Sequence, residues 1–158
     1  MGLGAPHWDS YARGMLIGLT RGTGRAHIAR AALESMCYQT RDAVEAMEAD
    51  SGIEIPTFKA DGGAAANQWM MQFQADILGV PVEVPETLET TALGAAYLAG
   101  LATDFWEDRE DLKNRWRLRR RYEPQMGDEE RERLYGRWKE ALDRAKNWAQ
   151  EAVESPLA

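Results

Sequence analysis

The stretch best suited to chemistry runs from Thr57 to Asn67, where a short apolar run ends in Asp61, Gly62 and Gly63. Two adjacent glycines let the chain turn sharply and let a ligand touch bare backbone. Asn67 then opens an amphipathic pattern, and a helix start presents unpaired N–H groups and the positive end of its dipole. Such a turn suits a nucleotide. The alternative is a tight strand-to-helix turn that holds no ligand.

Other chemistries have little support in the sequence. The chain has one cysteine, Cys37, and two histidines, without zinc-ligand spacing, a phosphate-binding glycine-lysine loop or a G-x-S-x-G motif. Cys37 lies in a helical pattern, and we expect it to be buried and unreactive. Asp61 is the best candidate for an active-site acid, although loop hydrogen bonding would equally explain it. We therefore predict no catalytic residue and no metal ligand in this chain.

The composition predicts one domain, or one domain with an appendage, in 158 residues that are 44% hydrophobic. The net charge of −7 argues against nucleic acid as a partner. An arginine cluster is the local exception, and we interpret it as a solvated helix face: Arg115, Arg117, Arg119, Arg120 and Arg121. No apolar run reaches the roughly 20 residues that span a membrane, and no signal peptide opens the sequence. With no intrachain disulfide possible, these features predict a cytoplasmic protein.

Alternating strands and helices are predicted for the first hundred residues, which indicates an α/β fold. A buried strand is expected at 14–19, because it is apolar on both faces. A helix over about 26–49 should end at Gly52, burying a stripe that includes Ile28, Ala32, Met36, Ala43 and Met47, with Asp42 among the charged residues outside.

Two further strands, 57–60 and 80–84, should flank a helix that begins after the glycine turn and closes at Gly79. Thr90 or Thr91 should cap the next helix, whose small residues, including Gly94, predict close packing against another element. Beyond residue 105 the charged sequence predicts a helical appendage, with Asp128 capping a last helix to about 153. The expected division is therefore 1–105 and 106–158.

Four stretches together resemble the carboxy-terminal half of the glycerol kinases, in the FGGY carbohydrate kinase family. The opening loop 2–14 resembles theirs, with His7 where tyrosine is usual. The run 14–34 fits the family's second signature, and 38–42 resembles the glycerol kinases more than their pentose-specific relatives. The stretch Asp61–Asn67 is similar to the family's adenosine motif, supported by 90–96.

The resemblance implies a partial ribonuclease H-like, actin-like ATPase domain with a helical appendage. It implies ATP and Mg²⁺ as cofactors, with Gly63 and Asn67 contacting the nucleotide and Gly62 shaping the turn. Asn67 could instead be a helix cap, and both roles are compatible. The small residues Ala64, Ala65 and Ala66 would let adenine or ribose lie close.

The family's amino-terminal half, which carries its catalytic aspartate and polyol-binding residues, has no counterpart here. The resemblance therefore implies that this chain is inactive alone and reaches glycerol only through that missing half. The open sheet edges that this leaves predict a homo-oligomer. Another FGGY kinase, for gluconate or xylulose, and a non-catalytic interaction module are the alternatives. A dinucleotide oxidoreductase is disfavoured, because no G-x-G-x-x-G follows the first strand.

Overall fold

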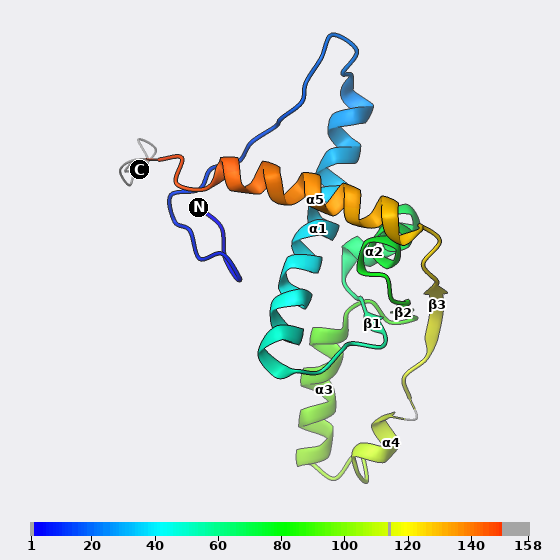
Figure 1. Cartoon of the computed structure of the whole chain (residues 1–158). Helices are drawn as coiled ribbons and strands as arrows, with labels where there is room; N and C mark the ends of the chain where they lie inside the picture. Colours follow the sequence, from blue (N-terminus) through cyan, green and yellow to red (C-terminus); the bar gives the residue numbers. More distant parts are fainter. Residues whose placement is uncertain (1, 114, 150–158) are drawn as a thin grey trace. The chain divides into compact units, whose positions relative to one another are not determined.

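The computed structural model describes residues 2–113 and 115–149, and the chain forms two compact units (Figure 1). One unit combines Met1–Glu54 with Met126–Ala158, and the other is the continuous segment Ile55–Gln125. The boundary predicted at residue 105 separates the family domain from the appendage, which is a different division from that into compact units. It stays a prediction. Among the described residues, no helix combines the length and the apolar character that a membrane crossing requires.

The first unit is built on two helices, α1 (Arg25–Ser51) and α5 (Asp128–Ala145), which pack against each other. The chain leaves α1 at Gly52, whose φ of 69° is the left-handed conformation that glycine adopts without strain. This helix and its end confirm the prediction. The buried side chains of the unit include Cys37, Tyr38 and Val44 from α1 and Tyr135 and Leu142 from α5.

The second unit contains a three-stranded sheet in the order β1-β2-β3. The short β1 (Phe58–Lys59) runs parallel to β2 (Val82–Pro85), and β3 (Leu118–Tyr122) runs antiparallel to β2. Helix α2 (Gln68–Leu78) packs on β2 and β3, and its Phe73, Ala75 and Ile77 are buried. A 3₁₀ turn η1 (Gly63–Ala66) precedes α2, while α3 (Thr90–Ala102) and α4 (Arg109–Lys113) lie between β2 and β3.

The prediction of a buried strand at 14–19 is wrong. These residues are exposed and have no regular secondary structure, Gly18 has a φ of 84°, and they belong to no sheet among the described residues. An apolar extended segment becomes a strand only when another segment supplies partners for its backbone N–H and C=O groups. The stripe predicted for α1 is wrong at Ile28, Met36 and Met47, which are exposed, whereas Cys37 and Val44 beside it are buried.

The arginine cluster does not form a helix face. Arg119, Arg120 and Arg121 lie in β3, within the stretch that we predicted to be helical. Arg121 pairs with Glu83 at 2.7 Å and with Glu123 at 2.5 Å. Cross-strand pairing with β2 thus overrides the high local charge, because exposed charged side chains are well suited to an edge strand.

The last two predicted caps are also wrong. Glu89 and Gly127 occupy the N-cap positions of α3 and α5, so Thr90 and Asp128 are their first helical residues. Helix α5 ends at Ala145, and residues 150–153 of the predicted helix lie outside the described residues. Helix α3 buries none of its residues, and nothing lies within 4 Å of where a Cβ at Gly94 would be. Close packing occurs instead near the end of α3, where the Trp106 side chain lies against Gly100 so tightly that a Cβ there would collide with it.

Candidate functional site

The glycine turn lies at the carboxyl ends of the two parallel strands. The Ala60 N–H at the end of β1 donates to Glu83 O of β2 at 3.0 Å, and Gly62 N–H donates to Leu88 O at 2.9 Å. The loops that follow β1 and β2 are therefore joined at one edge of the sheet. Ligands of α/β sheets bind at this edge.

Gly62 and Gly63 differ in conformation. Gly62 has φ 78° and ψ 178°, which only glycine adopts readily, and its carbonyl accepts from Ala65 N–H at 3.1 Å to begin η1. Gly63 has no positive φ, and no atom lies within 4 Å of the position that its Cβ would take. Gly62 thus makes the turn, and Gly63 leaves open space beside bare backbone.

The three alanines of η1 do not share one role. Ala64 and Ala66 are exposed, whereas Ala65 is buried beneath the turn. Space for a ligand therefore exists over Ala64 and Ala66, but Ala65 packs inward. Asp61, the candidate acid, is exposed.

Asn67 is the N-cap of α2. Its Oδ1 accepts from Met70 N–H at 3.1 Å, which pairs one of the unpaired donors of the helix start. The residue is exposed, and the cap occupies only Oδ1, so the amide Nδ2 can still donate to a ligand. The structure brings Gly62, Gly63 and Asn67 together around η1.

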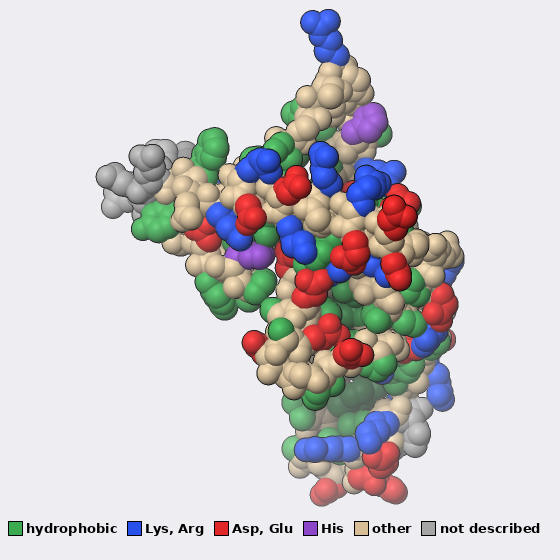
Figure 2. All heavy atoms as spheres, viewed as in Figure 1, with side chains coloured by type: hydrophobic (Ala, Val, Ile, Leu, Met, Phe, Trp, Pro, Cys, Tyr) green, Lys and Arg blue, Asp and Glu red, His purple; other side chains and the backbone are tan. Residues whose placement is uncertain are grey.

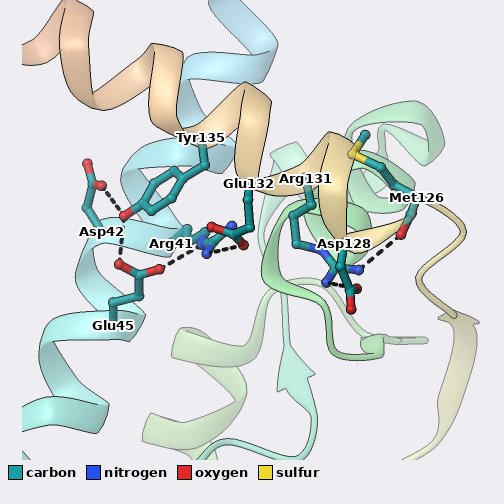
Figure 3. Close-up of polar contacts among 8 residues, drawn as sticks. All are labelled: Arg41, Asp42, Glu45, Met126, Asp128, Arg131, Glu132 and Tyr135. Carbon is teal, nitrogen blue, oxygen red and sulfur yellow. Dashed lines mark hydrogen bonds and ion pairs between the residues drawn. The ribbon is translucent and has the colours of Figure 1, made fainter.

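A second polar cluster joins α1 to α5 in the other unit, and the sequence did not predict it (Figure 3). Asp42 is only 7% exposed. Its Oδ1 lies 2.6 Å from Tyr135 Oη, and its Oδ2 accepts from Trp138 Nε1 at 2.9 Å and faces His7 Nε2 at 3.4 Å. The prediction that Asp42 lies outside is therefore wrong, because these partners allow its carboxylate to be buried.

The same hydroxyl of Tyr135 also lies 3.0 Å from Glu45 Oε2, and the Arg41 guanidinium lies 3.9 Å from the centre of its ring. Burial raises the pKa of Tyr135, and the neighbouring Asp42 carboxylate raises it further. Tyr135 therefore stays protonated, and its single hydroxyl proton is donated to the buried Asp42, whose Oδ1 is the nearer of the two carboxylate oxygens. The buried polar groups of Asp42 and Tyr135 are thus paired with each other. Such pairing is typical of a structural contact between helices rather than of a reactive acid.

No group of three or more His, Cys, Asp or Glu side chains within 2–113 and 115–149 has a metal-binding arrangement. Cys37 is buried as predicted, and burial raises the pKa of its thiol to about 12, with Glu34 adding to the shift. A thiol that keeps its proton at neutral pH is a poor nucleophile. The turn of Gly62 and Gly63 is the candidate binding site among the described residues, because it combines open space with exposed backbone.

The fold is that of sugar kinases with an actin-like ATPase fold. A crystal structure of Plasmodium falciparum glycerol kinase with ADP is similar, with a TM-score of 0.80 and 37% identity, over 91% of this chain and 29% of that chain. A gluconate kinase from Lactobacillus acidophilus shares the fold, with a TM-score of 0.71 and 24% identity, over 87% of this chain and 28% of that one. The α/β actin-like fold class is thereby confirmed.

The chain belongs to the FGGY family of carbohydrate kinases, whose C-terminal domain matches residues 1–103. It is 64% identical over 148 residues to glycerol kinase 2 of Thermotoga maritima, covering 94% of this chain and 30% of that protein. It is 62% identical over 151 residues to a glycerol kinase of Caldanaerobacter subterraneus, covering 96% of this chain and 30% of that protein. The chain thus spans about 30% of the length of these curated relatives.

Proposed function

We propose that this chain is the nucleotide-binding carboxy-terminal part of a glycerol kinase. The complete enzyme would transfer the γ-phosphate of ATP to glycerol and release ADP and glycerol 3-phosphate. The observation that carries the proposal is the open backbone at Gly63, beside Asn67, in a chain about 60% identical to glycerol kinases. We also propose that the enzyme is cytoplasmic and forms a homo-oligomer.

In this proposal the turn holds the nucleoside end of ATP. Gly62 shapes the turn, the Gly63 backbone lies against the nucleotide, and Asn67 donates from Nδ2. Mg²⁺ would come with the phosphates of ATP, since kinases bind it through phosphate oxygens and one or two carboxylates. Phosphoryl transfer needs a base, metal ions and charge stabilisation around both reactants. Glycerol and the catalytic base would belong to the remainder of the enzyme, so the chain alone is expected to be inactive.

The test joins this chain to the part of Thermotoga maritima glycerol kinase 2 that precedes the matched region. The purified fusion should form ADP from ATP and Mg²⁺ in a glycerol-dependent manner, while the chain alone should not. Gluconate and xylulose serve as alternative substrates. Activity on either sugar, with none on glycerol, would reassign the chain to another FGGY kinase. A soluble, folded fusion that is inactive on all three would count against a kinase role.

Calorimetric titration of the isolated chain with ATP addresses the non-catalytic alternative. Weak but saturable binding is expected, because part of the nucleotide surface is present. An absence of binding by both the chain and the fusion would favour an interaction module instead.

A further inference from the structure

The segment 86–117 leaves the sheet after β2 and returns to it at β3, and a hydrogen bond closes it at its two ends. Glu86 N–H donates to Arg117 O at 3.0 Å, so the first and last residues of the segment are joined. Two residues after Glu86, the Leu88 carbonyl accepts from Gly62 N–H at 2.9 Å. The closing hydrogen bond is thus only two residues along the chain from the hydrogen bond that holds the glycine turn.

The segment between these ends is weakly buried. Helix α3 buries none of its residues, and the α4 side chains of Arg109, Glu110 and Lys113 are exposed. Figure 2 shows acidic and basic side chains close together in the region where Figure 1 places α4. Segments that bury few apolar side chains open locally at a low cost in free energy. The position of the loop 86–88 therefore depends strongly on the contacts near the closing hydrogen bond.

Two tryptophan rings hold cations beside that hydrogen bond. The Arg115 guanidinium lies 4.1 Å from the ring centre of Trp106, and Lys59 Nζ lies 4.4 Å from the ring centre of Trp116. Lys59 belongs to β1 and Trp116 precedes β3, so the second contact crosses β2. A cation is attracted to the face of an aromatic ring, most strongly to that of tryptophan. The contact therefore ties the start of β3 to β1, the strand that leads into the glycine turn.

We propose that Trp116 is a positioning residue for the nucleotide-binding turn. Lys59 holds the Trp116 ring, and the ring fixes the adjacent carbonyl of Arg117. That carbonyl holds the loop 86–88, and the loop holds Gly62 through the hydrogen bond described above. The inference rests on the proposed function, because it names a residue that the same ATP site depends on. A displacement of about 1 Å at a binding site is enough to lower its efficiency, so a residue that touches no ligand can still affect ATP binding.

Hydrogen exchange of the chain without ligand, followed by NMR, tests the positioning step. In Trp116→Ala, the amides of Gly62 and Glu86 should exchange about fivefold faster than in the wild type, as expected for loss of a cation–π contact. The Ala60 amide, which donates to Glu83 O at 3.0 Å between β1 and β2, is the internal reference and should change by less than about twofold. Unchanged exchange at Gly62 would overturn the proposal, and so would equal acceleration at Ala60, which would mean a general loosening of the sheet.

Substitutions of Lys59 separate the cation from the bulk of the side chain. Lys59→Arg keeps a cation that can lie on the ring, so exchange at Gly62 should stay at the wild-type rate. Lys59→Met keeps a long side chain without charge and should speed that exchange about threefold. Trp148→Ala is the matched control for Trp116→Ala, because Trp148 is 69% exposed and belongs to the other compact unit. Equal exchange in the Arg and Met variants would exclude a role for the cation and overturn the proposal.

Kinetics of the fusion with the Thermotoga part test the effect on the nucleotide. Trp116→Ala should raise KM for ATP about fivefold and leave kcat and KM for glycerol within about twofold, because it weakens ATP binding without touching the reacting groups. A general loss of stability would not produce this split. A lower kcat with an unchanged KM for ATP would overturn the positioning role. The exchange measurements need no enzymatic activity, so selective exchange at Gly62 in a chain whose fusion is inactive would count against the proposed function alone.

Discussion

Gly62 and Gly63 are adjacent, but the turn uses them differently. Gly62 has the conformation that other residues avoid, whereas Gly63 has ordinary backbone with open space beside it. The tasks of forming the turn and admitting a ligand are thus separable at the scale of one residue.

A pair of substitutions tests this separation. Gly62→Ala should lower the free energy of unfolding of the chain by about 1–3 kcal/mol, because alanine is strained at its φ and ψ. Gly63→Val should leave that free energy within about 0.5 kcal/mol, as expected for an exposed site. In the active fusion with the Thermotoga part, Gly63→Val should weaken ATP binding at least tenfold. Urea denaturation and ATP titration measure the two effects, and unchanged ATP affinity would exclude contact at Gly63.

Tyr135 is the residue on which the joint between α1 and α5 most depends. Tyr135→Phe removes the donor nearest to Asp42 Oδ1 and leaves a buried carboxylate short of a partner. The free energy of unfolding should fall by about 1–3 kcal/mol in urea denaturation. Tyr11→Phe, at an exposed tyrosine, should change it by less than about 0.5 kcal/mol. Equal effects of the two substitutions would refute the importance of this hydrogen bond.

At the scale of elements, the start of α2 has a structural use as a helix cap and a proposed use in binding. Asn67→Ala should lower stability by about 1 kcal/mol through loss of the cap, while Asn67→Ser keeps a cap acceptor and should lower it by much less. Both should weaken ATP binding in the fusion, because neither retains the Nδ2 donor. If Asn67→Ser binds ATP like the wild type, Asn67 acts only as a helix cap.

Local signals in the sequence predicted the elements of the site well. Gly52 and Gly79 marked the ends of α1 and α2, and both take the left-handed conformation that the pattern implied. The cap at Asn67 was predicted as one of two roles. Its contact with a nucleotide, like those of Gly62 and Gly63, remains a prediction, since no ligand tests it. Signals that act within one turn of helix do not depend on distant parts of the chain, which is why they sufficed.

Features that depend on distant partners could not be predicted in this way. The apolar pattern of segment 14–19 is typical of a strand, but a strand needs a neighbouring segment for its backbone hydrogen bonds, and the sequence pattern does not specify one. The strand identity of Arg119–Arg121 is set by register with β2, and the burial of Asp42 is set by Tyr135 and Trp138, more than 90 residues away. The periodicity of one segment carries no information about such partners.

At the scale of the whole molecule, the structure changes the reason for expecting self-association. The sheet edges are poor sites for it, because β1 has two residues and β3 carries consecutive arginines. The exposed apolar surface at 14–19 is the better candidate, since large apolar patches promote association.

The chain alone should therefore associate with increasing concentration in sedimentation velocity. Leu16→Asp should shift the distribution toward monomer, while Met47→Asp should not. A monodisperse monomer at all concentrations would contradict this prediction.

The order of the units along the chain has a consequence for biosynthesis. Ile55–Gln125 is one continuous segment, so its parts emerge from the ribosome in an unbroken run. Helix α1, in contrast, emerges some 75 residues before α5, the helix that it packs against. During that interval Asp42 lacks Tyr135 and Trp138, and the apolar side of α1 has no partner from its own unit. Domains begin to fold during synthesis, and incompletely covered intermediates are prone to aggregate. The nascent chain should therefore need chaperone protection chiefly over α1, and for as long as the 55–125 segment takes to translate.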